Sequence, residues 1–326
     1  MALESLLSIL ADGEFHSGES LGQQLGVSRA AVWKQLKKLD SLGIDCHSVK
    51  GRGYRVPGGI NLLQIEQLRQ GLTPAAQQGL SEIELALSIP STNRLAMQQA
   101  QQQNCHGRLY LAEQQTAGRG RRGRDWASPF GRNLYFSLSW SFSGGAAALE
   151  GLSLVVGLAL QQGMQALGVD GVELKWPNDL LFRGRKLAGV LLEMSGDASG
   201  LCQVVIGVGV NVAMPQTAAQ EIDQPWTDLV TIAQRPLDRN AVLAGLLNAL
   251  IPAMQQFEQQ GFAPFREQWQ QHNAHRDQLV RLSTESFTVQ GRCVGVNESG
   301  ALLLQSDEGE QAFHGGELSL RSLDDT

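Results

Sequence analysis

The first sixty residues have the spacing of short amphipathic helices. Leucines at positions 3, 6, 7 and 10 form one apolar stripe, and Gly13 ends that helix. A second helix is predicted over residues 19–25, and a third begins after Ser28, an N-cap residue, with apolar side chains at positions 32, 36 and 39. Two helices joined by a tight turn, with a hairpin at residues 44–56, predict a winged helix-turn-helix domain over residues 1–60. The alternative is a small helical bundle with a solvated basic face.

Strand-like and helix-like segments alternate in the central region. Residues 146–167 are the clearest helix, and residues 60–71 predict a helix that links the first domain to the rest. The strand candidates cover residues 82–87, 109–113, 133–140, 172–175, 179–182, 187–194 and 204–212. Many of them are hairpin neighbours, so we expect an α+β domain over residues 61–275 in which helices cover a mixed, largely antiparallel sheet.

The last fifty residues form a separate β-rich segment. From Gln278, short strands alternate with turns at residues 297–300, 307–309 and 315–316. This spacing predicts a small SH3-like β-barrel over residues 276–326. No side chain in it indicates chemistry, so a structural cap and a role beside a ligand site both remain open.

Composition is that of a cytoplasmic multidomain protein. An apolar share of 42% in 326 residues is ample for buried cores, and the length suits two or three domains. The four cysteines are scattered, with neither a CxxC pair nor histidines at ligand spacing, which favours reduced thiols and predicts no metal site built by the protein. The start of the chain has no basic leader and no apolar run is long enough to span a bilayer, so we expect no membrane partner.

Charge is concentrated near the start of the chain. The whole sequence carries −6 at pH 7, yet residues 28–55 hold seven Lys or Arg against two Asp, a local +5. A basic third helix and hairpin predict binding to DNA. The residues expected to reach phosphates or base edges are Ser28, Arg29, Trp33, Lys34, Lys37, Lys50 and Arg52.

The densest cluster of charge is T-A-G-R-G-R-R-G-R-D-W, residues 116–126, which we call the arginine loop. Guanidinium groups match phosphate or carboxylate oxygens two at a time, and glycines let backbone N–H groups approach the same oxygens. A nucleic-acid tether is the alternative, but tethers usually occupy tails or linkers and this run lies between two predicted strands. We therefore expect a loop that closes over an anion. Its charged and hinge residues are Gly118, Arg119, Gly120, Arg121, Arg122, Gly123 and Arg124.

Four further clusters lie at the ends of predicted strands. Ser91-Thr92-Asn93 opens a helix, either as a simple N-cap or as a set of donors for a small polar ligand. K-W-P-N-D, residues 175–179, is a turn fixed by proline. Lys186 enters an apolar strand, where a lysine usually extends to solvent. In G-V-G-V-N, residues 207–211, the glycines allow close approach of a ligand or of another backbone.

In their order and spacing, these motifs resemble those of biotin protein ligases. The resemblance rests on E-Q-Q-T-A-G-R-G-R-R-G-R-D-W, K-W-P-N-D, R-K-L-A-G-V-L-L-E and I-G-V-G-V-N-V, and the winged helix in front extends it to the bifunctional biotin ligase and biotin-operon repressors. It implies a central fold like that of class II synthetases and biotin–lipoate ligases. It also implies a two-step reaction in which biotin and ATP, with Mg²⁺ on the triphosphate, form biotinyl-5′-AMP, and a target lysine then takes the biotinyl group.

The resemblance also implies roles for individual residues. Asp179 is open to three of them, since it could position the adenylate, organise its turn or accept a proton from the incoming lysine. The implied catalytic residues are Arg119, Arg121, Lys186 and Asp179. The implied biotin-binding residues are Ser91, Thr92, Asn93, Gln115, Gly118, Arg119, Gly120, Arg121, Trp126, Lys186 and Gly189. The implied ATP- or adenylate-binding residues are Arg121, Arg122, Arg124, Lys175, Asn178 and Asn211.

The partners that the resemblance implies are the biotin carboxyl carrier protein of acetyl-CoA carboxylase, the biotin operator DNA and a second copy of the chain, bound when the ligand is present. Three alternatives remain open from the sequence. They are a ligase whose winged helix no longer represses, a lipoate or octanoate ligase of the same fold, and a ligand-sensing repressor without catalysis. The intact arginines and Lys186 favour a catalytic protein.

Overall fold

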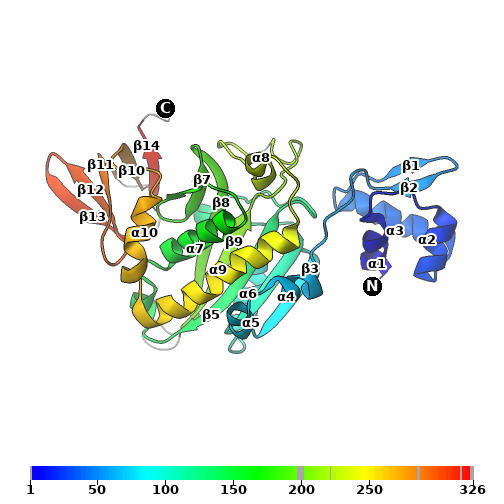
Figure 1. Ribbon diagram of the computed structural model, residues 1–326, viewed down its shortest axis with the longest axis horizontal. Helices are drawn as coiled ribbons and strands as arrows, with labels where there is room; N and C mark the ends of the chain where they lie inside the picture. The colour runs from blue at the N-terminus through cyan, green and yellow to red at the C-terminus, as the bar shows by residue number, and fades with distance from the viewer. Residues whose placement is uncertain (1, 197–201, 221, 285–286, 316–317, 324–326) are drawn as a thin grey trace.

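The computed structural model describes residues 2–196, 202–220, 222–284, 287–315 and 318–323. These residues form three units that follow one another along the longest axis of the molecule (Figure 1). The N-terminal helices and the small hairpin lie at one end, a large sheet with its helices lies in the middle, and the C-terminal strands lie at the other end. Among the described residues, no helix has both the length and the apolar character needed to cross a bilayer.

The N-terminal unit confirms the winged helix-turn-helix. It consists of α1 (Ala2–Leu10), α2 (Gly18–Leu25), α3 (Arg29–Ser41) and a hairpin of β1 (His47–Val49) and β2 (Gly53–Arg55). Ser28 caps α3 as predicted, because its hydroxyl oxygen accepts a hydrogen bond from Ala31 N. Gly26 ends α2 in the left-handed region with φ 65°, a conformation that costs glycine little. The predicted apolar stripes of α1 and α3 form the core of this unit.

The central sheet has seven strands in the order β3-β4-β5-β9-β8-β7-β6. Only the β3–β4 pair is parallel, so the mixed, largely antiparallel prediction is confirmed. Each predicted strand coincides with an observed one. Their bounds are β3 (Glu82–Ile89), β4 (Arg108–Gln115), β5 (Leu134–Phe142), β6 (Glu173–Lys175), β7 (Asp179–Phe182), β8 (Arg185–Gly196) and β9 (Cys202–Val210).

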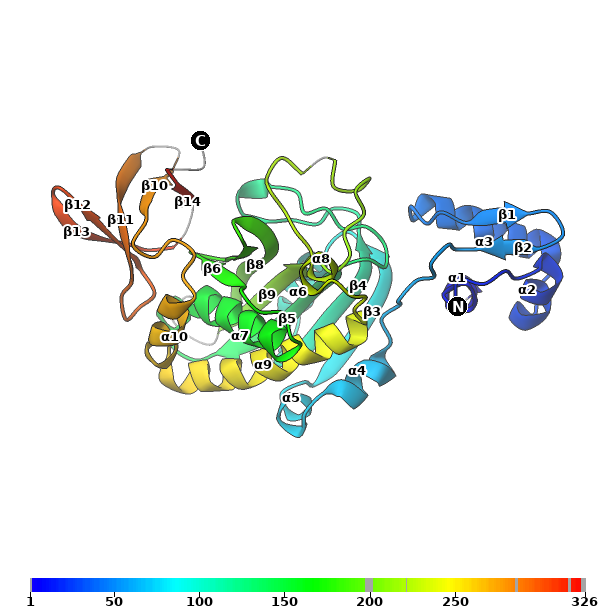
Figure 2. The ribbon, with the colours of Figure 1, turned by 45° about the horizontal axis from the view of Figure 1, so that its top comes forward.

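Helices cover both faces of this sheet. On one face α7 (Leu152–Ala166) and α9 (Arg239–Gln260) lie side by side (Figures 1 and 2). On the other face α6 (Thr92–Ala100) packs against β4 and β9. The strand between them, β5, is buried along its whole length, with large apolar side chains toward α7 and α9 and serines toward α6. This serine-bearing face is where the predicted ligand residues gather.

Two helix predictions are wrong at their starts. The helix predicted over residues 146–167 is a 3₁₀ turn, Ala146–Leu149, followed by α7. Gly151, at φ 79°, separates them because a continuous helix has no left-handed residue. The linking helix predicted over residues 60–71 reduces to α4 (Ile65–Gly71), followed by α5 (Pro74–Gln78). The sequence pattern also did not predict α9, which contains Pro252.

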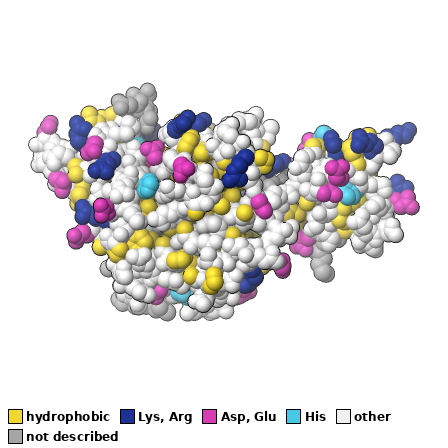
Figure 3. Space-filling view, in the orientation of Figure 1, with side chains coloured by type: hydrophobic (Ala, Val, Ile, Leu, Met, Phe, Trp, Pro, Cys, Tyr) yellow, Lys and Arg dark blue, Asp and Glu magenta, His cyan; other side chains and the backbone are white. Residues whose placement is uncertain are grey.

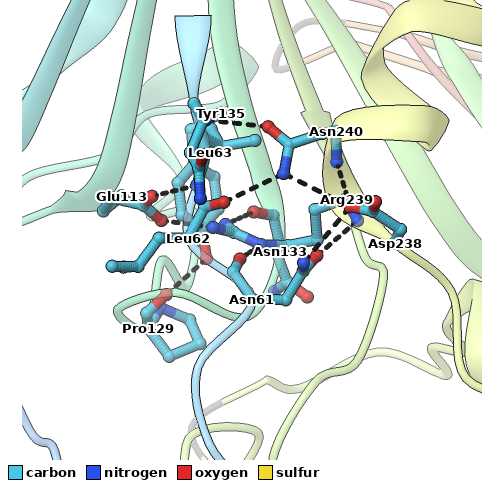
Figure 4. Close-up of polar contacts among 11 residues, drawn as sticks. Asn61, Leu62, Leu63, Glu113, Pro129, Asn133, Tyr135, Asp238, Arg239 and Asn240 are labelled. Atoms are coloured by element: carbon cyan, nitrogen blue, oxygen red, sulfur yellow. Dashed lines mark hydrogen bonds and ion pairs between the residues drawn. The ribbon is translucent and has the colours of Figure 1, made fainter. Parts of the chain in front are cut away.

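Residues 61–64 are not helical, and a buried ion pair holds their backbone (Figure 4). Arg239, at the start of α9, pairs with Glu113 of β4, and both are almost fully buried. Glu113 Oε1 accepts from Leu63 N at 2.6 Å, and Arg239 Nε donates to Asn61 O at 2.9 Å. Asn240 adds a bond in each direction, from Gln64 N and to Leu62 O. We call this set the linker clamp, since it fixes the segment between the winged helix and the sheet.

The C-terminal unit is a five-stranded antiparallel sheet in the order β13-β12-β11-β10-β14, which confirms the small β domain. The predicted turns at residues 297–300 and 307–309 are observed, whereas Gly316 of the third turn lies outside the described residues. Trp176 Nε1, in the central unit, donates to Gly300 O at 3.1 Å and so fixes one end of this sheet. The strands are β10 (Leu279–Ser283), β11 (Thr288–Val296), β12 (Leu302–Ser306), β13 (Gly309–Phe313) and β14 (Ser319–Ser322). The short helices α8 (Leu229–Ala233) and α10 (Arg266–Gln271) complete the chain.

Candidate active site

The arginine loop is a narrow hairpin between β4 and β5. Gly120 N donates to Arg124 O at 2.7 Å, and Trp126 N donates to Gly118 O at 3.0 Å. These bonds cross the loop near its tip and at its base. Arg122, at the tip, lies in the left-handed region with φ 59°, which is uncommon for a residue with a side chain. The hairpin therefore presents several guanidinium groups from one short, closed segment, as the sequence predicted.

Arg121 joins the loop to two other parts of the protein. Its Nη1 donates to Asn178 Oδ1 at 2.9 Å, in the K-W-P-N-D turn, and its Nη2 donates to Leu318 O at 3.2 Å, next to β14. Arg119, Arg122 and Arg124 are exposed. One arginine thus positions the loop while its neighbours face solvent, where an anion can approach them.

Trp126 lies over a floor of two glycines that are partners across β8 and β9. Gly189 and Gly209 are opposite one another in the sheet. A Cβ on Gly209 would overlap the indole ring, and a Cβ on Gly189 would lie 3.2 Å from Trp126 Cζ3. The glycines predicted to permit close approach therefore make room for Trp126. Among the described residues no hydrogen-bond partner reaches Trp126 Nε1, although that atom is buried.

Lys186 does not extend to solvent as an isolated lysine on an apolar strand would. Its ammonium is 2.9 Å from Asp179 Oδ1 and 5.4 Å from the centre of the Trp126 ring, and both members of the pair are mostly buried. Its backbone is also held, since its N–H donates to Pro225 O and its carbonyl accepts from Thr227 N. The structure thus brings Lys186, Asp179, Gly189 and Trp126 together, as predicted.

The predicted biotin residues at the start of α6 form a buried hydrogen-bond network. Ser91 caps the helix, so the simple N-cap role is confirmed. Gln115 Oε1 accepts from the backbone N–H of Thr92 at 2.9 Å and lies 3.2 Å from its hydroxyl. Gln115 Nε2 donates to Ser128 Oγ at 3.2 Å, and Ser128 donates to Trp126 O at 2.9 Å. The network therefore continues from α6 into the base of the arginine loop, beside Gly118.

Three residues that the sequence did not single out belong to this network. Ser137 Oγ lies 2.6 Å from Asn93 Oδ1 and 2.8 Å from Thr92 Oγ1. Asn93 Nδ2 donates to Glu193 Oε2 at 2.8 Å. Ser128 is the third. The regular alternation of serine and large apolar residues in β5 was the available signal for Ser137, because it places a polar residue on a buried face.

The two remaining predicted nucleotide residues lie at strand ends. Lys175 ends β6 and is the register partner of Asp179 across the turn. Asn211 follows β9 and is almost fully buried, with its Nδ2 donating to Thr227 O at 3.1 Å. No hydrogen-bond partner reaches Asn211 Oδ1 among the described residues. This oxygen is an acceptor that a ligand can use.

A cavity of about 650 Å³ lies between the arginine loop and the C-terminal unit. Its walls are Arg119–Gly123, the Pro177–Asn178 turn, the start of α7, residues 190–193 of β8, and residues 299–301 and 314–315 of the C-terminal unit. Glu193 is the member of the α6 network that reaches its lining, whereas Lys186 and Trp126 do not. Trp126 fills the space over the glycine floor. The described residues contain no cluster of His, Cys, Asp or Glu suited to hold a metal ion.

The winged helix has a basic outer face, and Lys and Arg side chains lie along its upper edge in Figure 3. Trp33 is half exposed, and Lys37 Nζ lies 3.9 Å from the centre of its ring. Arg52, on the hairpin, stacks on Phe15 at 4.1 Å. The predicted DNA-binding residues lie at the N-cap of α3, on α3 and in the turn of the hairpin. All seven, Ser28, Arg29, Trp33, Lys34, Lys37, Lys50 and Arg52, are exposed.

Comparison with known proteins agrees with this arrangement. The model of the Biotin/lipoate A/B protein ligase family matches residues 85–211, a helix-turn-helix domain model matches residues 3–55, and the biotin protein ligase C-terminal domain model matches residues 277–321. The Bifunctional ligase/repressor BirA of Salmonella typhimurium is 41% identical, covering 98% of both chains. The Biotin--[acetyl-CoA-carboxylase] ligase of Paracoccus denitrificans is 36% identical over 64% of this chain and 88% of that protein.

Among solved structures, the biotin protein ligase from Aquifex aeolicus in complex with biotin and ATP matches with a TM-score of 0.64 and 30% identity. The match covers 74% of this chain and all of that one. The likeness to the Salmonella protein spans the winged helix, the sheet and the C-terminal unit at once. The chain therefore belongs to the biotin protein ligase family, in its group of bifunctional ligase/repressors.

Proposed function

We propose that the protein is an ATP-dependent biotin–[acetyl-CoA-carboxylase] ligase that also represses the biotin operon, with biotinyl-5′-AMP as corepressor. The observation that carries the proposal is the arginine loop, closed beside the Lys186–Asp179 pair. Likeness to ligase/repressors over 98% of the chain supports it. A cytoplasmic location and domains at residues 1–60, 61–275 and 276–326 are parts of the same proposal.

Charge is the main obstacle to the first step. Biotin's carboxylate attacks the α-phosphate of ATP, so two anions must meet before pyrophosphate leaves. Fixed cations lower this barrier when they lie where negative charge accumulates. Lys186 and the exposed arginines of the loop are such cations, and Arg121 holds the loop in place. Mg²⁺ would enter on the triphosphate and neutralise part of its charge.

The two ligands occupy adjacent regions in this proposal. Biotin lies near Ser91, Thr92, Asn93 and Gln115, whose network reaches the base of the loop. Gly118, Gly120 and Gly189 keep side chains out of its path. The nucleotide uses the cavity beside Arg121 and Asn178. Lys175 and the acceptor oxygen of Asn211, which lie outside the lining of that cavity, are assigned to the same ligand. Trp126 shields the mixed anhydride from water, which would otherwise hydrolyse it.

The second step transfers the biotinyl group to a lysine of the biotin carboxyl carrier protein. The incoming amine must lose a proton, and Asp179 is the carboxylate nearest to Lys186 among the described ion pairs. We rank positioning of the adenylate as its first role, organisation of the turn as its second and proton acceptance as its third. Because Asp179 is the register partner of Lys175, it also contributes to the structure of the turn between β6 and β7.

Biotin-dependent exchange of pyrophosphate into ATP tests the ligase directly. We expect exchange with biotin and little with octanoate, followed by biotinylation of a purified carrier domain. Exchange that prefers octanoate would identify a lipoate-type ligase instead. Exchange without transfer to the carrier domain would contradict the protein-ligase proposal while leaving adenylation intact.

For repression, we propose that the ligand favours a homodimer that places two winged helices on adjacent half-sites. The edge of β8 supports a dimer, because its pairing with β7 ends at Gly189 while its pairing with β9 continues to Gly196. Met194, on that stretch, is exposed. Strand edges of this kind pair readily with a second chain.

Sedimentation with and without biotin and ATP tests the dimer, and footprinting of the host's own biotin-synthesis promoter tests the repressor. We expect the ligands to lower the dimer dissociation constant and to strengthen protection of the promoter. Equal sedimentation under both conditions would contradict the ligand-induced dimer. An unprotected promoter would favour a ligase whose winged helix no longer represses.

A further inference from the structure

Glu193 is an acidic residue on the serine-bearing face of the sheet that neither step of the proposed reaction uses. It shares this face of β8 with Gly189 and Leu191, because side chains two apart on a strand point the same way. It also lines the cavity beside the arginine loop. Its Oε2 atom accepts a hydrogen bond from Asn93 Nδ2 at 2.8 Å. The carboxylate therefore contacts one of the residues proposed to hold biotin.

Asn93 is a buried amide whose two ends have similar shape and opposite polarity. Its side chain packs against Gly207, where an added Cβ would overlap it. This packing fixes the position of the amide group, but it fits equally well with oxygen and nitrogen exchanged. Something other than shape must therefore determine which end faces β8.

A carboxylate removes this ambiguity because it only accepts hydrogen bonds. Glu193 Oε2 at 2.8 Å and Leu191 O at 3.4 Å both draw Asn93 Nδ2 toward β8. Asn93 Oδ1 consequently faces Ser137, whose hydroxyl oxygen is 2.6 Å away. Ser137 has a single proton and is completely buried, so it donates that proton to Asn93.

The orientation that Glu193 imposes on the Asn93 amide also determines the direction of the hydrogen bonds at Thr92. The hydroxyl oxygens of Ser137 and Thr92 are 2.8 Å apart, but the Ser137 proton is directed at Asn93. Thr92 in turn donates its own proton to Ser137 or to Gln115 Oε1, at 3.2 Å. Both lone pairs of Thr92 remain available as acceptors. With the Asn93 amide reversed, the Ser137 proton would occupy one of them.

We infer that Glu193 is a positioning residue for substrate recognition, which keeps Thr92 an acceptor for the N–H groups of a cyclic urea. The inference rests on the proposed function. It identifies the ureido ring of biotin as the part of the substrate that Thr92 binds. Glu193 acts through Asn93 and Ser137, so its contribution belongs to ligand binding and not to the reacting atoms.

Glu193→Gln tests this inference, because glutamine has the same shape but can donate as well as accept. In pyrophosphate exchange we expect the KM for biotin to rise about tenfold, the loss expected for one misdirected buried hydrogen bond. The kcat and the KM for ATP should stay within about twofold of the wild-type values. The melting temperature should change little, whereas a purely structural role would lower it and leave the biotin KM unaltered.

Two further variants complete the test. Asn93→Asp combined with Glu193→Gln exchanges amide and carboxylate, so residue 93 again accepts from Ser137 and we expect the biotin KM to return toward the wild-type value. Glu84→Gln is the matched control, because Glu84 Oε2 also accepts from a side-chain amide of α6, that of Gln99 at 3.2 Å. It should leave the biotin KM unchanged.

The outcomes separate the inference from the function on which it rests. A biotin KM in Glu193→Gln equal to that of the wild type or of Glu84→Gln overturns the inference. A double variant no better than Glu193→Gln overturns it as well. A wild-type protein without biotin-dependent exchange would overturn the proposed function instead.

Discussion

Two ion pairs of the same chemistry lie in contrasting surroundings in this protein. In the linker clamp, Arg239 and Glu113 are 2% and 1% exposed and make further bonds to backbone groups of residues 61, 63 and 133. In the candidate active site, Lys186 and Asp179 are 16% and 18% exposed and lie against the Trp126 ring. The charged groups of the first pair are hydrogen-bonded to backbone groups of the protein. The second pair is bordered by the Trp126 ring and by Gly189.

This difference separates a structural pair from a functional one. Charges removed from water must recover their lost hydration through hydrogen bonds, and the clamp does so with backbone groups that cannot leave. The Lys186 ammonium faces a single carboxylate and the Trp126 ring, so it can turn toward an incoming anion at lower cost. We therefore expect the clamp to determine stability and the Lys186–Asp179 pair to determine rate.

Removing one side of the clamp should have the largest effect on stability. Arg239→Ala leaves the Glu113 carboxylate buried without its partner, so we expect the free energy of unfolding to fall by about 3–5 kcal/mol. Denaturant titration measures it. Arg235→Ala is the control, because this nearby arginine is exposed and its guanidinium donates to Leu167 O at the surface. If both variants lost equally little, the clamp would not be the structural pair described here.

Lys186→Ala should show the opposite pattern. Loss of a cation at the point where charge develops lowers adenylation about 10²–10³-fold. The free energy of unfolding should fall less than in Arg239→Ala, because the Asp179 carboxylate left without its partner is less buried than Glu113. Single-turnover formation of biotinyl-5′-AMP and denaturant titration measure the two quantities. Arg185→Ala, its exposed neighbour in the same hairpin, should alter neither. A large loss of stability without loss of rate would assign Lys186 to the fold.

The contrast between the two pairs also shows what the sequence could predict. Lys186 and Asp179 lie in short motifs, R-K-L-A-G and K-W-P-N-D, that two adjacent strands bring together, so local pattern was sufficient. Arg239 and Glu113 are separated by more than a hundred residues. Glu113 begins the motif that leads into the arginine loop, but Arg239 lies in no motif and nothing local pairs the two. Their pairing depends on how α9 docks against β4, and that is a tertiary outcome which periodicity does not encode.

The same reasoning explains the remaining successes and failures. Each strand of the central sheet was predicted because the pattern of a strand is local, and the Ser28 cap because it depends on the next three residues. Residues 60–64 were assigned to a helix because their own preferences do not include the clamp. Glu193 was read as part of an apolar strand, since its partner Asn93 lies a hundred residues earlier in the chain.

Arg121→Gly tests whether the arginine loop acts in function, as we expect of the Lys186–Asp179 pair. The variant removes the bonds to Asn178 and Leu318, so the loop is no longer tied to the cavity wall. We expect biotinyl-5′-AMP to escape about tenfold faster and to label lysines on bystander proteins. Chase experiments on the preformed adenylate measure the escape, with the exposed Arg132→Gly as control. An unchanged adenylate lifetime would show that Arg121 does not retain the intermediate.

The smallest effect is expected at Asp238, which precedes Arg239 and caps α9. Burial raises the pKa of this carboxyl. Hydrogen bonds from Asn240 and Asn61 together lower the pKa by more than burial raises it, so it lies below its ordinary value of about 3.9. A depressed pKa stabilises the fold above the unfolded value, and this contribution is lost as the pH falls through the folded value. Because Asp238 is exposed and screened, we expect Asp238→Asn to lower the free energy of unfolding by only about 0.5 kcal/mol at pH 7.

Denaturant titrations of the wild type and Asp238→Asn between pH 2 and pH 7 measure this difference. The two proteins should converge as the pH falls below the depressed folded pKa of Asp238, because the aspartate is then protonated in both the folded and the unfolded chain. Arg239→Ala should have the larger deficit of the two variants at pH 7, because it leaves a buried carboxylate without its partner. A constant gap between the wild type and Asp238→Asn at all pH values would mean that the cap acts through shape and not through charge.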